Sequence, residues 1–202
     1  MARELCQRCE YPIKNCICDS LTAVSHRTKV VILQHPSEVK NAKNTVRLLK
    51  LISNNLTILI GESEQDFAAF KQQVTEHSEQ YAVLFPGQGA VDLDSKNDSL
   101  THSLSHLIVI DGTWKKAKKI LMLNPWLNDI TKVSFTQELT SEYQIRTTSV
   151  SGGLSTIEAV AYSLNKIENC DTDPFIRALN GLKHSFTKRM SAQVKARYQQ
   201  RE

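Results

Sequence analysis

The chain is poor in the residues that build a nucleotide cradle. It has only seven glycines among 202 residues, and neither a Gly-x-Gly-x-x-Gly nor a Walker A pattern follows any predicted strand, which argues against a dinucleotide or P-loop site. No apolar run approaches the roughly 20 residues that a membrane span needs. The apolar segment of a secretion signal does not follow Met1 either. We therefore expect a cytoplasmic protein without membrane contact.

Cysteine is scarce outside one short segment. Four of the five cysteines lie within the first 18 residues, as Cys6-x-x-Cys9 and Cys16-x-Cys18, and the other is Cys170. Two close thiolate pairs on short turns can surround one tetrahedral zinc ion. The alternatives are two disulfides, which need an oxidising compartment, or an unmetallated redox-active pair. We predict structural zinc at Cys6, Cys9, Cys16 and Cys18, and an ordinary thiol at Cys170.

The length and composition are those of one globular domain with an appendage. A chain of 202 residues can bury a substantial core, and 41% hydrophobic with 23% charged residues is ordinary for a globular protein. The net charge of +4 permits a polyanionic partner without requiring one. We predict a zinc-binding knuckle over residues 1–22 and an α/β domain over residues 23–202.

Short apolar runs alternate with helical patterns after the cysteine segment. The runs are continuous, as in strands buried on both faces, and they cover residues 29–33, 56–60, 81–85 and 107–110. Between them, the spacing of apolar residues predicts helices over 37–52, 64–77 and 114–123. This alternation favours an α/β fold with a mostly parallel sheet flanked by helices.

Polar and glycine-containing segments follow each predicted strand. In an open α/β sheet, ligands bind at the carboxyl ends of the strands, so these segments are where chemistry is expected. They are Gln34-His35-Pro36, Gly61-Glu62-Ser63, Pro86-Gly87-Gln88-Gly89 and Asp111-Gly112-Thr113-Trp114.

Asp111 comes directly after an apolar strand, where a carboxylate would be partly desolvated, as suits a general base. Alternatively, Asp111 or Thr113 caps the helix that begins near Trp114, because both are good N-cap residues. Trp114 has two interpretations as well: it packs its helix on the sheet, or it stacks on a planar ligand.

A second helix start lies at Ser155. The pattern Ser155-x-x-Glu158 is a capping box, in which each side chain satisfies a backbone N–H group. The preceding Gly152-Gly153 would also let the helix start present N–H groups to an anion such as an amino-acid carboxylate. Both roles stay open on the sequence alone.

Two segments suit contact with RNA. In Ser141-x-Tyr143-x-x-Arg146, the aromatic ring can stack on a base and the guanidinium can bind a phosphate, although a solvated loop is the alternative. A helix predicted over 174–198 has an apolar stripe for the core and a basic face with few acids. The basic side chains are Arg177, Lys183, His184, Lys188, Arg189, Lys195 and Arg197. Polyanion contact and plain solvation stay open for this face.

Six motifs in the same order resemble the DTW-domain family. They are Cys6-x-x-Cys9…Cys16-x-Cys18, Gln34-His35-Pro36-x-Glu38, Asn44-Thr45, Asp111-Gly112-Thr113-Trp114, Ser141-x-Tyr143-x-x-Arg146 and Ser155-Thr156-x-Glu158-Ala159. The Asp-x-Thr-Trp signature that names the family stands at Asp111, Thr113 and Trp114. Each motif alone is weak, but six in order over most of the chain are specific.

The resemblance implies a SPOUT-like fold with a knotted C-terminal part in the domain at 23–202. It also implies transfer of the 3-amino-3-carboxypropyl group of S-adenosylmethionine to N3 of a uridine in the tRNA variable loop. We expect Asp111 to be the base. The expected cofactor-binding residues are Phe85, Pro86, Gly87, Asp111, Gly112, Thr113, Trp114, Leu154, Ser155, Thr156 and Glu158. The expected RNA-binding residues are His35, Asn44, Tyr143, Arg146, Lys188 and Arg189, and no obligate protein partner is expected.

Two other functions stay open on the sequence. An RNA methyltransferase of the same fold would move the methyl group of S-adenosylmethionine instead. A zinc-knuckle module that only binds RNA would not consume a cofactor at all. The mass added to the tRNA separates these functions.

Overall fold

The structure is a computed structural model that describes residues 4–95, 103–135 and 154–188. Its centre is a six-stranded sheet with the order β2-β1-β5-β3-β6-β4, in which every neighbouring pair is parallel. The strands are β1 (Lys29–Gln34), β2 (Leu56–Ile60), β3 (Tyr81–Leu84), β4 (Val91–Asp92), β5 (His106–Asp111) and β6 (Thr131–Ser134). The predicted α/β class with a mostly parallel sheet is confirmed.

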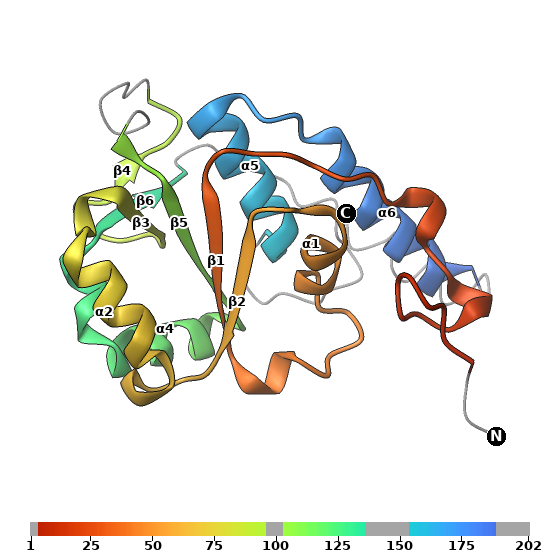
Figure 1. Ribbon diagram of the computed structural model, residues 1–202, viewed down its shortest axis with the longest axis horizontal. Coiled ribbons are helices and arrows are strands. Elements are labelled where there is room, and N and C mark those ends of the chain that lie inside the picture. The colour runs from red at the N-terminus through yellow and green to blue at the C-terminus, as the bar shows by residue number, and fades with distance from the viewer. Residues whose placement is uncertain (1–3, 96–102, 136–153, 189–202) are drawn as a thin grey trace.

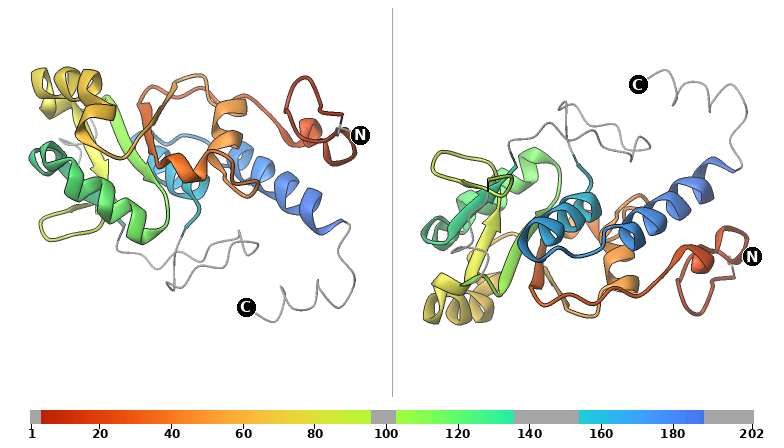
Figure 2. Two further views of the ribbon diagram at one scale, coloured as in Figure 1. Left: turned by 90° about the horizontal axis from the view of Figure 1, so that it is seen from below. Right: turned by 90° about the horizontal axis from the view of Figure 1, so that it is seen from above.

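Helices cover both faces of this sheet (Figures 1 and 2). They are α1 (Val46–Ile52), α2 (Ala68–Glu76), α4 (Trp114–Leu123), α5 (Thr156–Glu168) and α6 (Asp173–Thr187). Helices α1 and α5 share a core with Val30, Ile32 and Leu107 of the sheet, and α6 packs against α1 and α5. Helices α2 and α4 pack on the opposite face, which includes Val31 and Ile108. Burial on both faces explains why β1 and β5 are continuous apolar runs.

Short 3-10 turns connect the elements: η1 (Ile13–Asn15), η2 (Cys18–Ser20), η3 (Pro36–Glu38), η4 (Glu64–Phe67), η5 (Ser78–Gln80) and η6 (Pro125–Asp129). The four predicted strands and the helices over 64–77 and 114–123 are confirmed, the former of these as η4 followed by α2. Strands β4 and β6 were not predicted, because neither Val91-Asp92 nor Thr131-Lys132-Val133-Ser134 is a continuous apolar run. The residues beyond 188 of the predicted helix over 174–198 lie outside the described residues.

The single helix predicted over 37–52 is wrong, because the chain forms η3, a non-helical segment and then α1. Two asparagines cause the break. The side-chain oxygen of Asn41 accepts a bond from the N–H of Lys43 at 3.0 Å, and that of Asn44 accepts one from the N–H of Val46 at 2.9 Å. Side chains that bond to nearby backbone groups compete with the helical pattern. The apolar residues over 37–52 do recur at helical spacing, but the side-chain bonds of the two asparagines determine the local backbone conformation.

Residues 4–22 pack against the main domain rather than standing apart from it. Cys9, Tyr11, Ile17 and Leu21 belong to the core that α5 and α6 share. A Cβ atom on Gly181 of α6 would lie 2.5 Å from Cβ of Ser20 and still closer to its Oγ. Glycine therefore lets the cysteine segment lie directly on α6. The division at residue 22 and the knotted C-terminal part stay predictions, and residues 136–153 between β6 and α5 lie outside the described residues.

Candidate active site and cysteine cluster

The sheet has its switch point between β1 and β5. After β1 the chain passes through α1 to β2 on one side, and after β5 it passes through α4 to β6 on the other. Because α1 and α4 lie on opposite faces, the two connections diverge at the carboxyl ends of β1 and β5. Ligands of open α/β sheets bind at this place. Gln34 and Asp111 are paired there in register.

Asp111 is the centre of a buried hydrogen-bond network. Its side chain has no exposed surface, and its Oδ2 accepts bonds from Nε2 of Gln34 at 2.9 Å and from Nδ2 of Asn44 at 2.7 Å. Its Oδ1 accepts a bond from Oγ1 of Thr156 at 2.5 Å. The donors come from the end of β1, the segment before α1 and the start of α5. The carboxylate therefore joins three segments that are distant in sequence.

This geometry bears directly on the predicted role of Asp111. Its two oxygens accept three hydrogen bonds, which leaves one of about four acceptor sites, on Oδ1, for a proton. Because Asp111 has no exposed surface, a substrate can reach this site only if a neighbouring group moves. Its role as the base stays a prediction. Capping of α4 falls to Thr113, whose Oγ1 accepts a bond from the N–H of Lys116 at 3.5 Å, as the second interpretation of this motif had it.

Trp114, the tryptophan of the signature, is partly buried and partly exposed. Trp114 is 39% exposed, and its ring meets the ring of Phe85 edge to face with centroids 5.7 Å apart. Phe85 follows β3, and the next two residues, Pro86 and Gly87, are exposed. The predicted cofactor residues of the β3 loop and of the signature therefore lie beside each other, and the exposed part of Trp114 can contact a ligand.

The start of α5 is capped by the protein itself. The N–H and the hydroxyl of Ser155 donate to Oε2 of Glu158 at 2.7 and 2.6 Å, which confirms the capping box. The N–H of Ile157 donates to Oγ1 of Thr45 at 3.2 Å. Leu154, half-buried, precedes this turn. The cap takes up N–H groups that an anion could otherwise bind, and a role of Ser155, Thr156 and Glu158 toward a cofactor stays a prediction.

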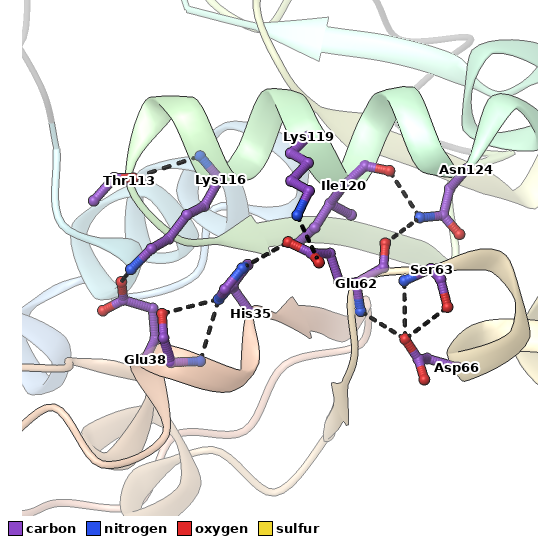
Figure 3. A network of polar contacts seen from close by, with 11 residues as sticks. His35, Glu38, Glu62, Ser63, Asp66, Thr113, Lys116, Lys119, Ile120 and Asn124 are labelled. Carbon is purple, nitrogen blue, oxygen red and sulfur yellow. Dashed lines mark hydrogen bonds and ion pairs between the residues drawn. The ribbon is translucent and has the colours of Figure 1, made fainter.

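A second polar network lies between the ends of β1 and β2 and the side of α4 (Figure 3). Nε2 of His35 lies 2.8 Å from Oε1 of Glu62, whose Oε2 accepts a bond from Nζ of Lys119 at 2.9 Å. The N–H of Ser37 donates to Nδ1 of His35, so the neutral ring carries its proton on Nε2 and donates it to Glu62. Nearby, the buried Glu38 accepts a bond from Nζ of Lys116 at 2.8 Å. Two ion pairs thus hold α4 against the strand ends.

These contacts limit two of the predicted RNA-binding residues. Asn44 is 2% exposed, and its side chain bonds to Asp111, Gln34 and the N–H of Val46. The ring of His35 bonds on both sides within the protein. Contact with RNA through either side chain would require these networks to open, and both assignments stay predictions.

The Glu62 network predicts a measurable pH dependence. The ammonium of Lys119 and the ring of His35 donate to Glu62 and lower the pKa of its carboxyl below the ordinary 4.5. A carboxyl with a lowered native pKa stabilises the fold above its unfolded-state pKa, and this contribution is lost as pH falls through the native value. Between about pH 5 and pH 3 we therefore expect the urea midpoint of the wild type to fall more steeply than that of Glu62→Gln.

Asp66 provides the internal reference for this measurement. The N–H groups of Glu62 and Ser63 and the hydroxyl of Ser63 lower the pKa of Asp66, and these bonds persist in the Glu62→Gln variant. In the Glu62→Gln variant, the fall of the urea midpoint with decreasing pH should therefore be smaller than in the wild type but still present. Identical slopes for the two proteins would show that the Glu62 contacts do not contribute to stability.

The four N-terminal cysteines form one compact cluster. Their Sγ atoms all lie within 4.8 Å of one another, and Sγ of Cys6 is 3.6 Å from those of both Cys16 and Cys18. Sγ of Cys9 is 3.8 Å from that of Cys16. Four sulfurs about 2.3 Å from a tetrahedral zinc ion would be about 3.8 Å apart. The cluster could therefore hold a metal ion, and all four thiols are free of disulfides.

The local backbone favours thiolate at one of these positions. The N–H groups of Cys9 and Arg8 bond to the sulfur of Cys6 and lower its pKa to about 6. Burial and the neighbouring thiols raise the pKa of Cys18 to about 12. In Cys170, outside the cluster, burial raises the pKa of the thiol, as in an unreactive core cysteine.

Of the remaining predicted RNA-binding residues, the structure describes only Lys188. Lys188 is the exposed C-cap residue of α6. Tyr143, Arg146 and Arg189 lie outside the described residues.

The sequence analysis did not name Gln34, Thr45 or Glu62 as site residues. A signal was present, since Gln34 and Glu62 stand in polar segments at strand ends and Thr45 belongs to the Asn44-Thr45 motif before α1. Nothing in the sequence shows which donors reach Asp111.

The comparison with known proteins decides the family. The family model described as DTW domain matches residues 3–195. The chain belongs to the DTW-domain family.

Two named animal relatives support this assignment. Over 199 residues the chain is 30% identical to "tRNA-uridine aminocarboxypropyltransferase 2" of Mus musculus, covering 96% of this chain and 66% of that protein. Over 175 residues it is 32% identical to the protein of the same name from Drosophila melanogaster, covering 83% of this chain and 68% of that protein. The chain thus spans about two thirds of the length of these curated relatives.

A plant relative is less similar to this chain than the two animal proteins. "tRNA-uridine aminocarboxypropyltransferase A" of Arabidopsis thaliana is 26% identical over 193 residues, covering 82% of this chain and 73% of that protein. No solved structure matches the chain. None of the described helices of this DTW-domain chain is long and apolar enough to cross a membrane.

Proposed function

We propose that this chain is a cytoplasmic enzyme that transfers the 3-amino-3-carboxypropyl group of S-adenosylmethionine to N3 of a uridine in the tRNA variable loop. The observation that carries the proposal is the family match over residues 3–195, together with relatives that are named for this transfer to tRNA uridine. The family signature also stands at the switch point of the sheet, which is the place where open α/β sheets generally bind ligands.

The residues at the strand ends suit such a donor. The exposed part of Trp114 and the neighbouring Phe85 offer aromatic surface for an adenine ring. A Cβ atom on Gly87 would meet nothing within 4 Å, so the loop after β3 is not crowded at this position. S-adenosylmethionine supplies the group that is transferred. The task of the protein is to orient it.

The transfer requires selection of one carbon and removal of one proton. A bond forms between N3 and the γ-carbon of the arm while the bond from that carbon to sulfur breaks, and methylthioadenosine leaves. Alignment of N3 with the γ-carbon, and away from the methyl group, supplies the selectivity and contributes several kcal/mol through proximity. The N3 proton must go to a base, and Asp111 is the candidate. N3 lies on the Watson–Crick edge, so the uridine must be unpaired when it reacts.

The structure also suggests why Asp111 matters beyond proton transfer. Its three hydrogen bonds join β1, the segment before α1 and the start of α5. Thr156 is the first residue of α5, so the carboxylate sets the position of this helix relative to the signature loop. We assign the cysteine cluster a purely structural role, since a sulfonium needs no metal to leave.

Nucleoside analysis of tRNA tests the proposal. We expect tRNA incubated with the protein and S-adenosylmethionine to gain one modified uridine, with release of methylthioadenosine. The aminocarboxypropyl group adds about seven times the mass of a methyl group, so the product identifies which carbon was aligned. Reactions without S-adenosylmethionine provide the control. A methylated uridine would show a methyltransferase, and tRNA bound without any mass change would show a module that only binds RNA.

A further inference from the structure

A groove lies between the cysteine segment and one face of α6. Its lining residues come from the segment of η1 and η2 on one side and from α6 on the other. Both views of Figure 2 show this segment beside α6. The residues that line it include Lys14, Asn15 and Asp19 of the first segment and Arg177, Gly181, His184 and Lys188 of α6. The helical members recur at intervals of three or four, so they share one face of α6.

Specific contacts fix the two walls relative to each other. Ile17 is buried in the shared core, and Gly181 allows Ser20 to lie directly on the helix. At the other end of the contact, the guanidinium of Arg177 donates to Oγ1 of Thr22 at 3.2 Å. The groove is therefore a built feature of the fold and not a gap between independent parts.

The groove is predominantly cationic. Lys14, Arg177 and Lys188 line it, all exposed, and Asp19 is the one carboxylate among the lining residues. Arg177 and Lys188 stand about three turns apart on α6, or about 16 Å along its axis. A row of separated cations along an open groove suits a chain of phosphates better than a single small anion.

One lining residue also offers an unused acceptor. Oδ1 of Asn15 is buried and, within the described part of the chain, has no hydrogen-bond partner. Buried polar atoms without partners are rare, and each calls for a ligand or a water molecule. Rotation of the Asn15 side chain would turn this oxygen into the groove, where it can accept a bond from a hydroxyl group, and RNA carries a 2′-hydroxyl on every ribose.

We propose that this groove binds the ribose-phosphate backbone of the RNA substrate, with Lys14, Arg177 and Lys188 on phosphates and Asn15 on a ribose hydroxyl. The inference rests on the proposed function and adds the place where the RNA is held. Because Lys14 and Asn15 lie between the cluster residues Cys9 and Cys16, the cluster also shapes one wall of the groove. RNA binding therefore depends on the metal that the cluster could hold.

Charge reversal with a matched control tests the groove. In Lys14→Glu/Arg177→Glu we expect at least tenfold weaker binding of unmodified tRNA, measured by fluorescence anisotropy without S-adenosylmethionine. The slope of log affinity against log salt should fall by about one for each lost phosphate contact. The control Lys115→Glu/Lys118→Glu makes the same change in net charge at exposed positions of α4, on the opposite face of the sheet. It should retain a salt slope closer to that of the wild type.

The outcomes separate this inference from the proposed function. Equal losses of tRNA affinity in both double variants would contradict RNA binding in the groove, because the change in net charge alone would explain them. An unchanged salt slope in the groove variant would overturn it as well. If Arg177→Glu disturbs folding, the tRNA affinity and salt slope of the single variant Lys14→Glu provide the test, since Lys14 lies on an exposed turn. Failure of the proposed function would appear instead as wild-type protein that binds tRNA but transfers nothing.

Removal of the metal gives an independent measurement. We expect chelation of the zinc-loaded protein to weaken tRNA binding while S-adenosylmethionine binding, followed by calorimetry, stays within a few-fold. The strand ends that carry the signature belong to different segments from the cysteine cluster. Unchanged tRNA affinity after complete metal removal would show that the cysteine wall does not contribute to the groove.

Discussion

The variant Asp111→Asn is expected to transfer at least about 100-fold more slowly than the wild type, which is the usual scale for losing a general base. Its affinity for S-adenosylmethionine should stay within a few-fold. Initial rates of modified-uridine formation at saturating co-substrate give the first quantity, and calorimetry gives the second.

The network around Asp111 makes asparagine a suitable replacement. The amide oxygen can accept from both Gln34 and Asn44, as Oδ2 of the carboxylate does. The amide nitrogen can donate to the hydroxyl of Thr156, because a hydroxyl both donates and accepts. Loss of the charge weakens these bonds, so we expect destabilisation of only about 1–3 kcal/mol. A folded variant therefore reports on chemistry.

Thr156→Val separates proton transfer from positioning. This variant keeps the carboxylate and removes only the donor to Oδ1. If Asp111 is the base, the transfer rate of Thr156→Val should fall far less than that of Asp111→Asn. Similar losses in both variants would show that the carboxylate positions α5. A near-normal rate in Asp111→Asn would show that another group or water takes the proton.

The second large effect is expected for Cys9→Ser. Cys9 is 1% exposed, and its sulfur is one of the four that lie within 4.8 Å of one another. Structural zinc in small domains contributes about 10–16 kcal/mol of apparent binding free energy, so losing one of four thiolates should release the metal. We expect the bound zinc to fall from one ion per chain to nearly none, as measured by elemental analysis.

The loss of metal should first loosen the cysteine segment. Hydrogen exchange should rise over residues 4–20 before it rises in β1 or β5, because those strands are buried by helices on both faces. Cys170→Ser is the matched control, since Cys170 is a buried thiol outside the cluster. Wild-type protein that contains no zinc and has its four N-terminal thiols paired as disulfides would contradict the metal assignment.

The predictions from sequence succeeded where the pattern is local. Continuous apolar runs identified β1, β2, β3 and β5. Burial on both faces explains the runs of β1 and β5, whereas β2 is an edge strand whose residues are only partly buried. The capping box at Ser155 was also visible, since both partners lie within one helical turn. The helix over 37–52 failed for a local reason too: Asn41 and Asn44 bond to nearby backbone groups in place of the helical pattern.

The candidate site needed the tertiary structure. The donors to Asp111 are Gln34, Asn44 and Thr156, which stand 77, 67 and 45 positions away from it in the sequence. Nothing in the spacing of the motifs shows that these side chains meet, or that their meeting leaves Asp111 without exposed surface. Order along the chain identified the family, but it did not predict which hydrogen bonds complete the site.

The sequence by itself determined the α/β class, the family and the clustering of the four cysteines, because periodicity, motif order and close spacing are properties of the chain alone. Only the tertiary structure decided that β1 and β5 are neighbours and that the cysteine segment lies on α6. Both depend on packing between distant residues, such as Ile17 in the shared core and Gly181 against Ser20. Such contacts are selected by the burial of complementary surfaces, which no local pattern encodes.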